Sequence, residues 1–178
     1  MLFSGGEPAL VPGVYEAARS LRAAGVVVEL YTSGFSLDER RADEAVDSFH
    51  VVHVSLDSAD ALLNDHIRGR EGAHEAAITA LDRLDARATA RRAAGVALPK
   101  IGIECTLVGA NNPGLEELVE YAARRWRSLD LLRQRRDPSG RGSSRDVTPI
   151  LVARDELASL RGARPEALAR DFGTSCST

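Results

Sequence analysis

Two adjacent glycines and a glutamate, Gly5, Gly6 and Glu7, stand near the start of the chain, directly after the apolar residues 1–3. Glycine has no Cβ, so at the end of a strand these residues let a ligand approach the backbone closely. Glu7 adds a carboxylate beside that backbone, and Pro8 restricts the exit of the turn. Backbone carbonyls and a carboxylate together suit a small molecule with a free ammonium group. A tight strand-to-helix turn with an incidental glutamate is the alternative interpretation.

Small and polar residues also follow three later apolar segments. Residues 32–34 read Thr-Ser-Gly, residues 55–57 read Ser-Leu-Asp, and a polar stretch runs from Thr106 to Asn112. In parallel α/β folds, ligands bind at the carboxyl ends of the strands. We therefore expect these segments and residues 4–7 to line the rim of one pocket.

The elements that would position this rim alternate between strand-like and helix-like patterns, which predicts an α/β fold with a mostly parallel sheet. The expected strands are 2–4, 26–31, 51–56, 101–107 and 129–132. The expected helices are 14–21, 37–46, 73–94 and 115–122, with a helical turn inside the polar stretch 57–72. A loop rich in Pro, Ser, Gly and Arg at 137–145 and two short helices at 154–160 and 165–170 follow.

Composition narrows the class of protein. The 178 residues suffice for one domain with a core, and a hydrophobic fraction of 44% excludes a disordered chain. A net charge of −3 and an aromatic fraction of 4% argue against a nucleic-acid partner. The sequence contains no apolar run of the roughly 20 residues that span a membrane and no signal-peptide pattern at its start. We expect a cytoplasmic protein with neither nucleic acid nor membrane as partner.

The two cysteines, Cys105 and Cys176, are too few for a disulfide framework or a complete metal site. Cys105 alternates with Ile101 and Ile103, which predicts a place in the core. The four histidines show no metal-ligand spacing. The sequence therefore indicates no metal ligands and no catalytic residue within this chain.

In their order along the chain, these segments resemble the motifs of the radical SAM superfamily over roughly residues 2–142. The resemblance implies a partial (β/α)6 TIM-like barrel over residues 1–142 with its first strand missing. It rests on the motif "GGEP" in 3–8, a variant of "TNG" in 31–34, "SLD … hd.iRG" in 52–57 and 64–69, the strand at 104–108 with the asparagines after it, and "P.GR" in 135–142.

The resemblance implies a binding site for S-adenosylmethionine. Glu7 and its glycines would hold the methionine ammonium, and Ser55 and Arg68 would reach the carboxylate, onto which a guanidinium can fork. Asp57 belongs to the same motif, although an N-cap of a following helical turn is a sufficient structural reason for it. The implied cofactor-binding residues are Gly5, Gly6, Glu7, Pro8, Thr32, Ser55, Asp57, Arg68, Leu107 and Asn111, the last two beside the adenosine.

The main departure from the family is a missing set of cysteines. Family members bind a [4Fe–4S] cluster through a CxxxCxxC motif, because thiolates hold such clusters, and this chain has no such triad. We expect an N-terminally truncated piece of a larger enzyme, whose sheet has an open edge where the first strand would lie. A degenerate relative that has lost its cluster is the alternative. As written, the chain is not expected to cleave S-adenosylmethionine.

For the complete protein, the resemblance implies a cluster that is reduced by an electron donor such as flavodoxin or ferredoxin. It also implies a 5′-deoxyadenosyl radical, which abstracts a hydrogen from the substrate. Residues 143–178 are expected to form a helical extension. Residues 172–178, with Cys176, resemble the start of a SPASM or twitch region, which would imply a peptide or protein substrate; a lone cysteine in a frayed tail is the alternative.

A non-catalytic scaffold or S-adenosylmethionine-binding domain is the rival function. A phosphate site is disfavoured because Glu7 would repel phosphate.

Overall fold

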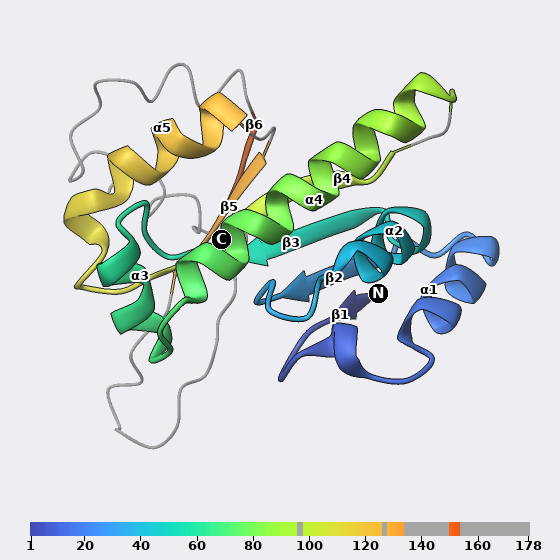
Figure 1. The fold of residues 1–178 in the computed structure, drawn as a ribbon, viewed down its shortest axis with the longest axis horizontal. Helices are drawn as coiled ribbons and strands as arrows, with labels where there is room; N and C mark the ends of the chain where they lie inside the picture. Colours follow the sequence, from blue (N-terminus) through green and yellow to red (C-terminus); the bar gives the residue numbers. More distant parts are fainter. Residues whose placement is uncertain (96–97, 126–127, 134–149, 154–178) are drawn as a thin grey trace, which may run out of the picture.

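The computed structural model describes residues 1–95, 98–125, 128–133 and 150–153. Its strands form one sheet in which spatial order follows chain order. The first five strands are parallel and the sixth is antiparallel to the fifth, which confirms the predicted alternation of parallel strands with helices. The strands are β1 (Leu2–Phe3), β2 (Glu29–Thr32), β3 (Val51–Ser55), β4 (Lys100–Leu107), β5 (Ser128–Arg133) and β6 (Ile150–Ala153) (Figure 1).

Two of the described helices begin at an aspartate whose side chain caps them. Asp38 accepts a hydrogen bond from the amide of Arg41, and Asp60 accepts one from the amide of Leu63, so each aspartate satisfies a free amide in the first turn of its helix. Asp60, and not Asp57, is therefore the N-cap of the helix after β3. The helices are α1 (Val14–Ala23), α2 (Glu39–Ser48), α3 (Ala61–Arg68), α4 (Ala73–Ala93) and α5 (Leu115–Arg125), with 3-10 turns η1 (Pro8–Leu10) and η2 (Asn112–Gly114).

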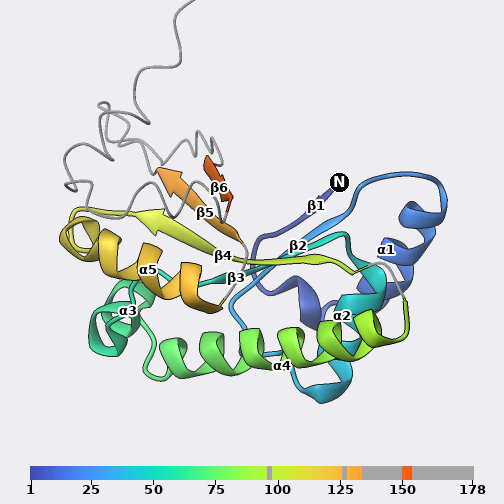
Figure 2. The ribbon, with the colours of Figure 1, turned by 90° about the horizontal axis from the view of Figure 1, so that it is seen from above.

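The described helices lie along one side of the sheet (Figure 2). Alternate strand residues such as Leu30, Val54 and Ile103 are fully buried and belong to the same core cluster as Leu81 and Leu84 of α4. Cys105 is buried with them, as predicted. The intervening residues face the opposite side of the sheet and are more polar; they include Tyr31, His53, Ser55 and Glu104.

Ion pairs join α2 to α4 on the outer surface of this helical layer. Arg91 binds Asp47 through two nitrogens at 2.5 and 2.8 Å and also contacts Asp43 at 3.1 Å. Arg87 pairs with Glu39 one turn away along α4. These ion pairs therefore connect α2 to α4 at the surface.

The structure differs from the sequence prediction in a few elements. The region after β3 contains the eight-residue helix α3 instead of a single helical turn. β6 was not predicted, because a run of four apolar residues has no distinctive periodicity. The predicted helices at 154–160 and 165–170 and the loop at 137–145 lie outside the described residues, and the domain boundary at 142 stays a prediction. None of the described helices is long and apolar enough to cross a membrane.

Candidate functional site

The carboxyl ends of β1 to β4 lie at one edge of the sheet because these strands are parallel and adjacent. Neighbouring strands are about 4.8 Å apart, so the loops that leave this edge are close together. The predicted rim segments follow these strands in order. The structure thus places Glu7, Ser55 and Arg68 along one edge of the molecule and not on different sides of it.

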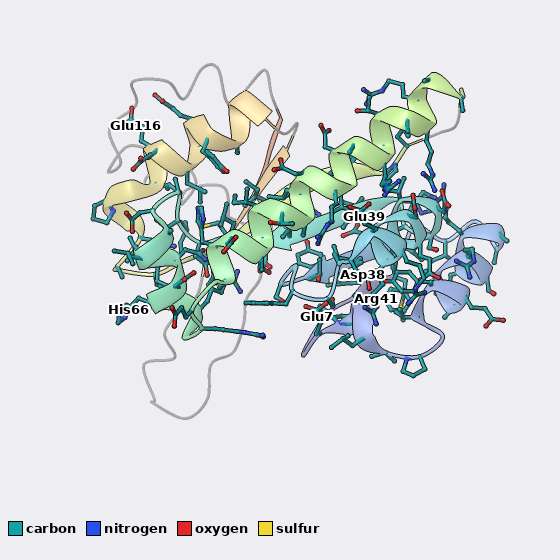
Figure 3. The ribbon with its side chains drawn as sticks, in the orientation of Figure 1. Glu7, Asp38, Glu39, Arg41, His66 and Glu116 are labelled. Atoms are coloured by element: carbon teal, nitrogen blue, oxygen red, sulfur yellow. The ribbon has the colours of Figure 1, made fainter. Side chains whose placement is uncertain are left out.

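Glu7 is held in place by the loop after β2. Its Oε1 accepts a hydrogen bond from the Thr32 hydroxyl at 2.7 Å, and its Oε2 accepts one from the Ser33 amide at 2.9 Å and another from the Ser33 hydroxyl. Figure 3 shows Glu7 where the first two strands end. A carboxylate has about four acceptor positions, so Glu7 keeps capacity for an N–H donor of a ligand. Thr32 is almost fully buried and acts here through Glu7.

The two glycines before Glu7 leave their backbone open. Gly5 and Gly6 have φ angles of +88° and +56°, a region that L side chains rarely adopt. Both residues are exposed, and nothing lies within 4 Å of the position that a Cβ would take. Pro8, in contrast, is buried at the first position of η1, so it shapes the turn. A hollow of about 350 Å³ lies beside Gly5 against α1, and Glu7 does not line it.

Ser55 and Glu104 form a second polar pair on adjacent strands. They are partners in the β3–β4 register, and the Ser55 hydroxyl donates a hydrogen bond of 2.7 Å to Oε2 of Glu104. With its hydrogen given to Glu104, the Ser55 oxygen is left as an acceptor. The motif at 104–108 includes Glu104, but the sequence did not identify its side chain as part of the site, because its partner is 49 residues away.

Asp57 lies at the end of β3 and is only 3% exposed. Its Oδ1 accepts a hydrogen bond from the Thr106 amide at 2.7 Å, and its Oδ2 lies 2.8 Å from Nε of Arg68. Its own amide donates to Asn64 of α3 at 2.9 Å. Burial raises the pKa of Asp57 above its ordinary value, while Arg68 and the Thr106 amide act in the opposite direction.

Arg68 is the last residue of α3, and its side chain is 27% exposed. Its Nε and Nη2 atoms are buried and make no hydrogen bond within the part of the chain that the structure describes. Nε is close enough to Asp57 for an ion pair. Nη2 thus remains a buried donor that an acceptor on a ligand could satisfy.

Asn111 closes the turn after β4 and is only 2% exposed. Its amide nitrogen donates to the carbonyls of Asp57 at 2.8 Å and Thr106 at 3.0 Å, and its oxygen accepts from the Val108 amide at 2.9 Å. These bonds tie the β3 and β4 loops together. Leu107, at the end of β4, is half-buried. The predicted contacts of Leu107 and Asn111 with adenosine stay predictions.

Two further titratable groups are buried and uncharged. Burial lowers the pKa of His53 to about 4, so its imidazole is neutral, and its ring lies 4.6 Å from that of Tyr31. Burial raises the pKa of the Cys105 thiol, which therefore stays protonated. Among the residues described, no group of three or more His, Cys, Asp or Glu side chains could hold a metal ion.

The residues at this edge fit the amino-acid part of S-adenosylmethionine. Glu7 offers acceptors suited to an ammonium group, and Arg68 offers a donor suited to a carboxylate. The described residues do not fit the ligand set of an iron–sulfur cluster, because the one described cysteine is a buried, protonated thiol. Cluster ligands would have to come from outside this sequence, which has no cysteine triad.

Comparison with known proteins identifies the family. The model of the radical SAM superfamily matches residues 1–104, more than half of the chain. The protein therefore belongs to the radical SAM superfamily, which confirms the family predicted from the rim motifs.

Individual relatives agree with this assignment. The chain is 35% identical over 140 residues to the mycofactocin maturase MftC of Mycobacterium tuberculosis, covering 78% of this chain and 33% of the relative. It is 32% identical over 121 residues to the pre-heme d1 synthase of Dinoroseobacter shibae, covering 67% and 27%. The chain thus spans about a third of the length of the curated relatives it matches.

A solved structure shares the fold. The crystal structure of SuiB from Streptococcus suis has a TM-score of 0.58 at 16% identity and covers 97% of this chain and 35% of that chain. This likeness supports the predicted partial TIM-like barrel, in which parallel strands alternate with outer helices.

Proposed function

We propose that this chain forms the S-adenosylmethionine-binding part of a radical SAM enzyme. The observation that carries this proposal is the geometry of Glu7: Thr32 and Ser33 fix its carboxylate in place, and about one acceptor position remains for a ligand. A fixed carboxylate binds an ammonium group with little further loss of side-chain entropy. The open backbone of Gly5 and Gly6 supports the same role, because it lets the ligand lie against the turn.

In the proposed binding mode, two residues of opposite charge bind the two charged groups of the ligand's amino-acid part. Glu7 holds the ammonium, and Arg68 holds the carboxylate. Exchanging the two would bring like charges together, so this edge binds the methionine group in one orientation. In the complete protein, a [4Fe–4S] cluster held by cysteines from outside this sequence would supply the electron for cleavage of S-adenosylmethionine into methionine and a 5′-deoxyadenosyl radical.

For the complete protein, the proposal extends to its substrate, its electron donor and its compartment. A relative named as a maturase supports a peptide or protein substrate, and residues 143–178 would lead into a SPASM or twitch region. The electron donor would be a flavodoxin or ferredoxin, and the compartment the cytoplasm. Binding of S-adenosylmethionine by a complete protein that takes up no iron on anaerobic reconstitution would favour the rival, a non-catalytic domain.

Calorimetric titration of the 178-residue chain with S-adenosylmethionine tests the proposal. Glu7→Gln should weaken binding by about tenfold to a hundredfold, the range expected for a hydrogen bond to a charged group. Glu16→Gln is the matched control, because Glu16 is exposed on α1, and it should bind like the wild type. The proposal is wrong if the wild type does not bind or if Glu7→Gln binds equally well.

A further inference from the structure

Both carboxylate oxygens of Asp57 have partners within the protein. Oδ1 accepts the hydrogen bond from Thr106, Oδ2 faces Arg68, and the backbone amide of Asp57 is bound by Asn64. These contacts come from β4 and α3, so the carboxylate cannot turn without breaking a bond between elements. A group that is buried and engaged in this way is poorly placed to touch a ligand.

Arg68 is the group that this carboxylate orients. Asp57 attracts the guanidinium from the Nε side, and the buried Nη2 lacks a hydrogen-bond partner in the described chain. A buried donor without a partner is unfavourable, and an acceptor on a ligand would remove this cost. The arrangement therefore leaves Arg68 poised to receive an anionic group.

Ser55, the other residue expected at the ligand carboxylate, is engaged differently. Its hydroxyl hydrogen is given to Glu104, so its oxygen can only accept. A ligand carboxylate needs donors. Of the two residues, Arg68 is the one that has a donor to offer.

We propose that Asp57 is a positioning residue that aims Arg68 at the carboxylate of S-adenosylmethionine and does not itself touch the cofactor. This inference rests on the proposed function. Asp57→Asn tests it with little change of shape, because Oδ1 can still accept from Thr106. The new amide group would replace the negative charge opposite Arg68, so the guanidinium would lose what orients it.

The experiment compares two ligands that differ only in the group at issue. Decarboxylated S-adenosylmethionine keeps the ammonium and the sulfonium but lacks the carboxylate. The wild type should prefer S-adenosylmethionine by about tenfold. Asp57→Asn should lose most of that preference by weakening binding of S-adenosylmethionine alone. Arg68→Lys, which keeps the charge without the guanidinium, should lose it too, whereas Asp60→Asn at the α3 N-cap should retain it.

The outcomes separate the proposal from a merely structural role. If Asp57→Asn weakens both ligands equally, or leaves the preference intact, the positioning role is overturned. A second readout needs no ligand: the NMR signal of the Arg68 Nε–H is assigned by its loss in Arg68→Lys. It should exchange slowly with water in the wild type, because Nε is buried beside Asp57, and faster in Asp57→Asn, where loss of the ion pair lets the guanidinium move toward solvent. If the wild type binds neither ligand, the proposed function fails, and an Nε–H signal unchanged in Asp57→Asn overturns the positioning role itself.

Discussion

Replacing Gly34 with alanine should lower the free energy of unfolding by about 2–5 kcal/mol. Gly34 has a φ of +88°, and an added Cβ would lie 2.9 Å from the Ala76 carbonyl oxygen, 3.0 Å from the Ala80 Cβ and 3.1 Å from the Ala77 Cα. The left-handed backbone costs a residue with a Cβ about 1–2 kcal/mol. Overpacking adds about 1–3 kcal/mol, because the atoms it meets belong to the rigid helix α4.

Gly5→Ala is a matched control for the backbone part of this cost. Gly5 has the same φ of +88°, yet no atom lies within 4 Å of its Cβ position. It should therefore lose only about 1–2 kcal/mol. Urea unfolding followed by circular dichroism measures both variants, and the difference between them reports the contact with α4. Equal losses in the two variants would refute the close approach of the β2 loop to α4.

Two further predictions concern buried titratable groups. Because burial lowers the pKa of His53 from 6.5 to about 4, the unfolded chain binds more protons between these values. The contribution of neutral His53 to the free energy of unfolding should therefore be fully present above about pH 6.5 and fall by up to about 3 kcal/mol toward pH 4. Urea unfolding at several pH values measures this dependence. The same dependence of the unfolding free energy on pH in His53→Gln would contradict the prediction. In a Cys176→Ser background, Cys105 should resist a thiol reagent such as Ellman's reagent until the chain is unfolded, since its thiol is buried and its pKa is raised. Rapid reaction of the folded chain would contradict this.

The sequence predicted the order of the elements because apolar runs such as 51–56 and the alternation at 101–107 are local signals. It predicted less about the partners of polar side chains, which depend on register. Ser55 and Glu104 meet only because β3 and β4 pair at those positions. Asp57 has the pattern of a helix cap in the sequence, yet Asp60 takes that role and Asp57 is buried. Nothing local distinguishes these two aspartates, because contacts with Thr106 and Arg68 decide between them.

β1 comprises two residues and pairs with β2 at two positions. A two-residue strand is held only weakly by its own pairing. The hydrogen bonds from Thr32 and Ser33 to Glu7 therefore help to hold the first residues of the chain against β2. Glu7, which is proposed to bind the ligand, thereby also stabilises the position of β1. An ammonium group would bind Glu7 only while these hydrogen bonds hold it in place, so binding would favour the ordered state of the N-terminal segment.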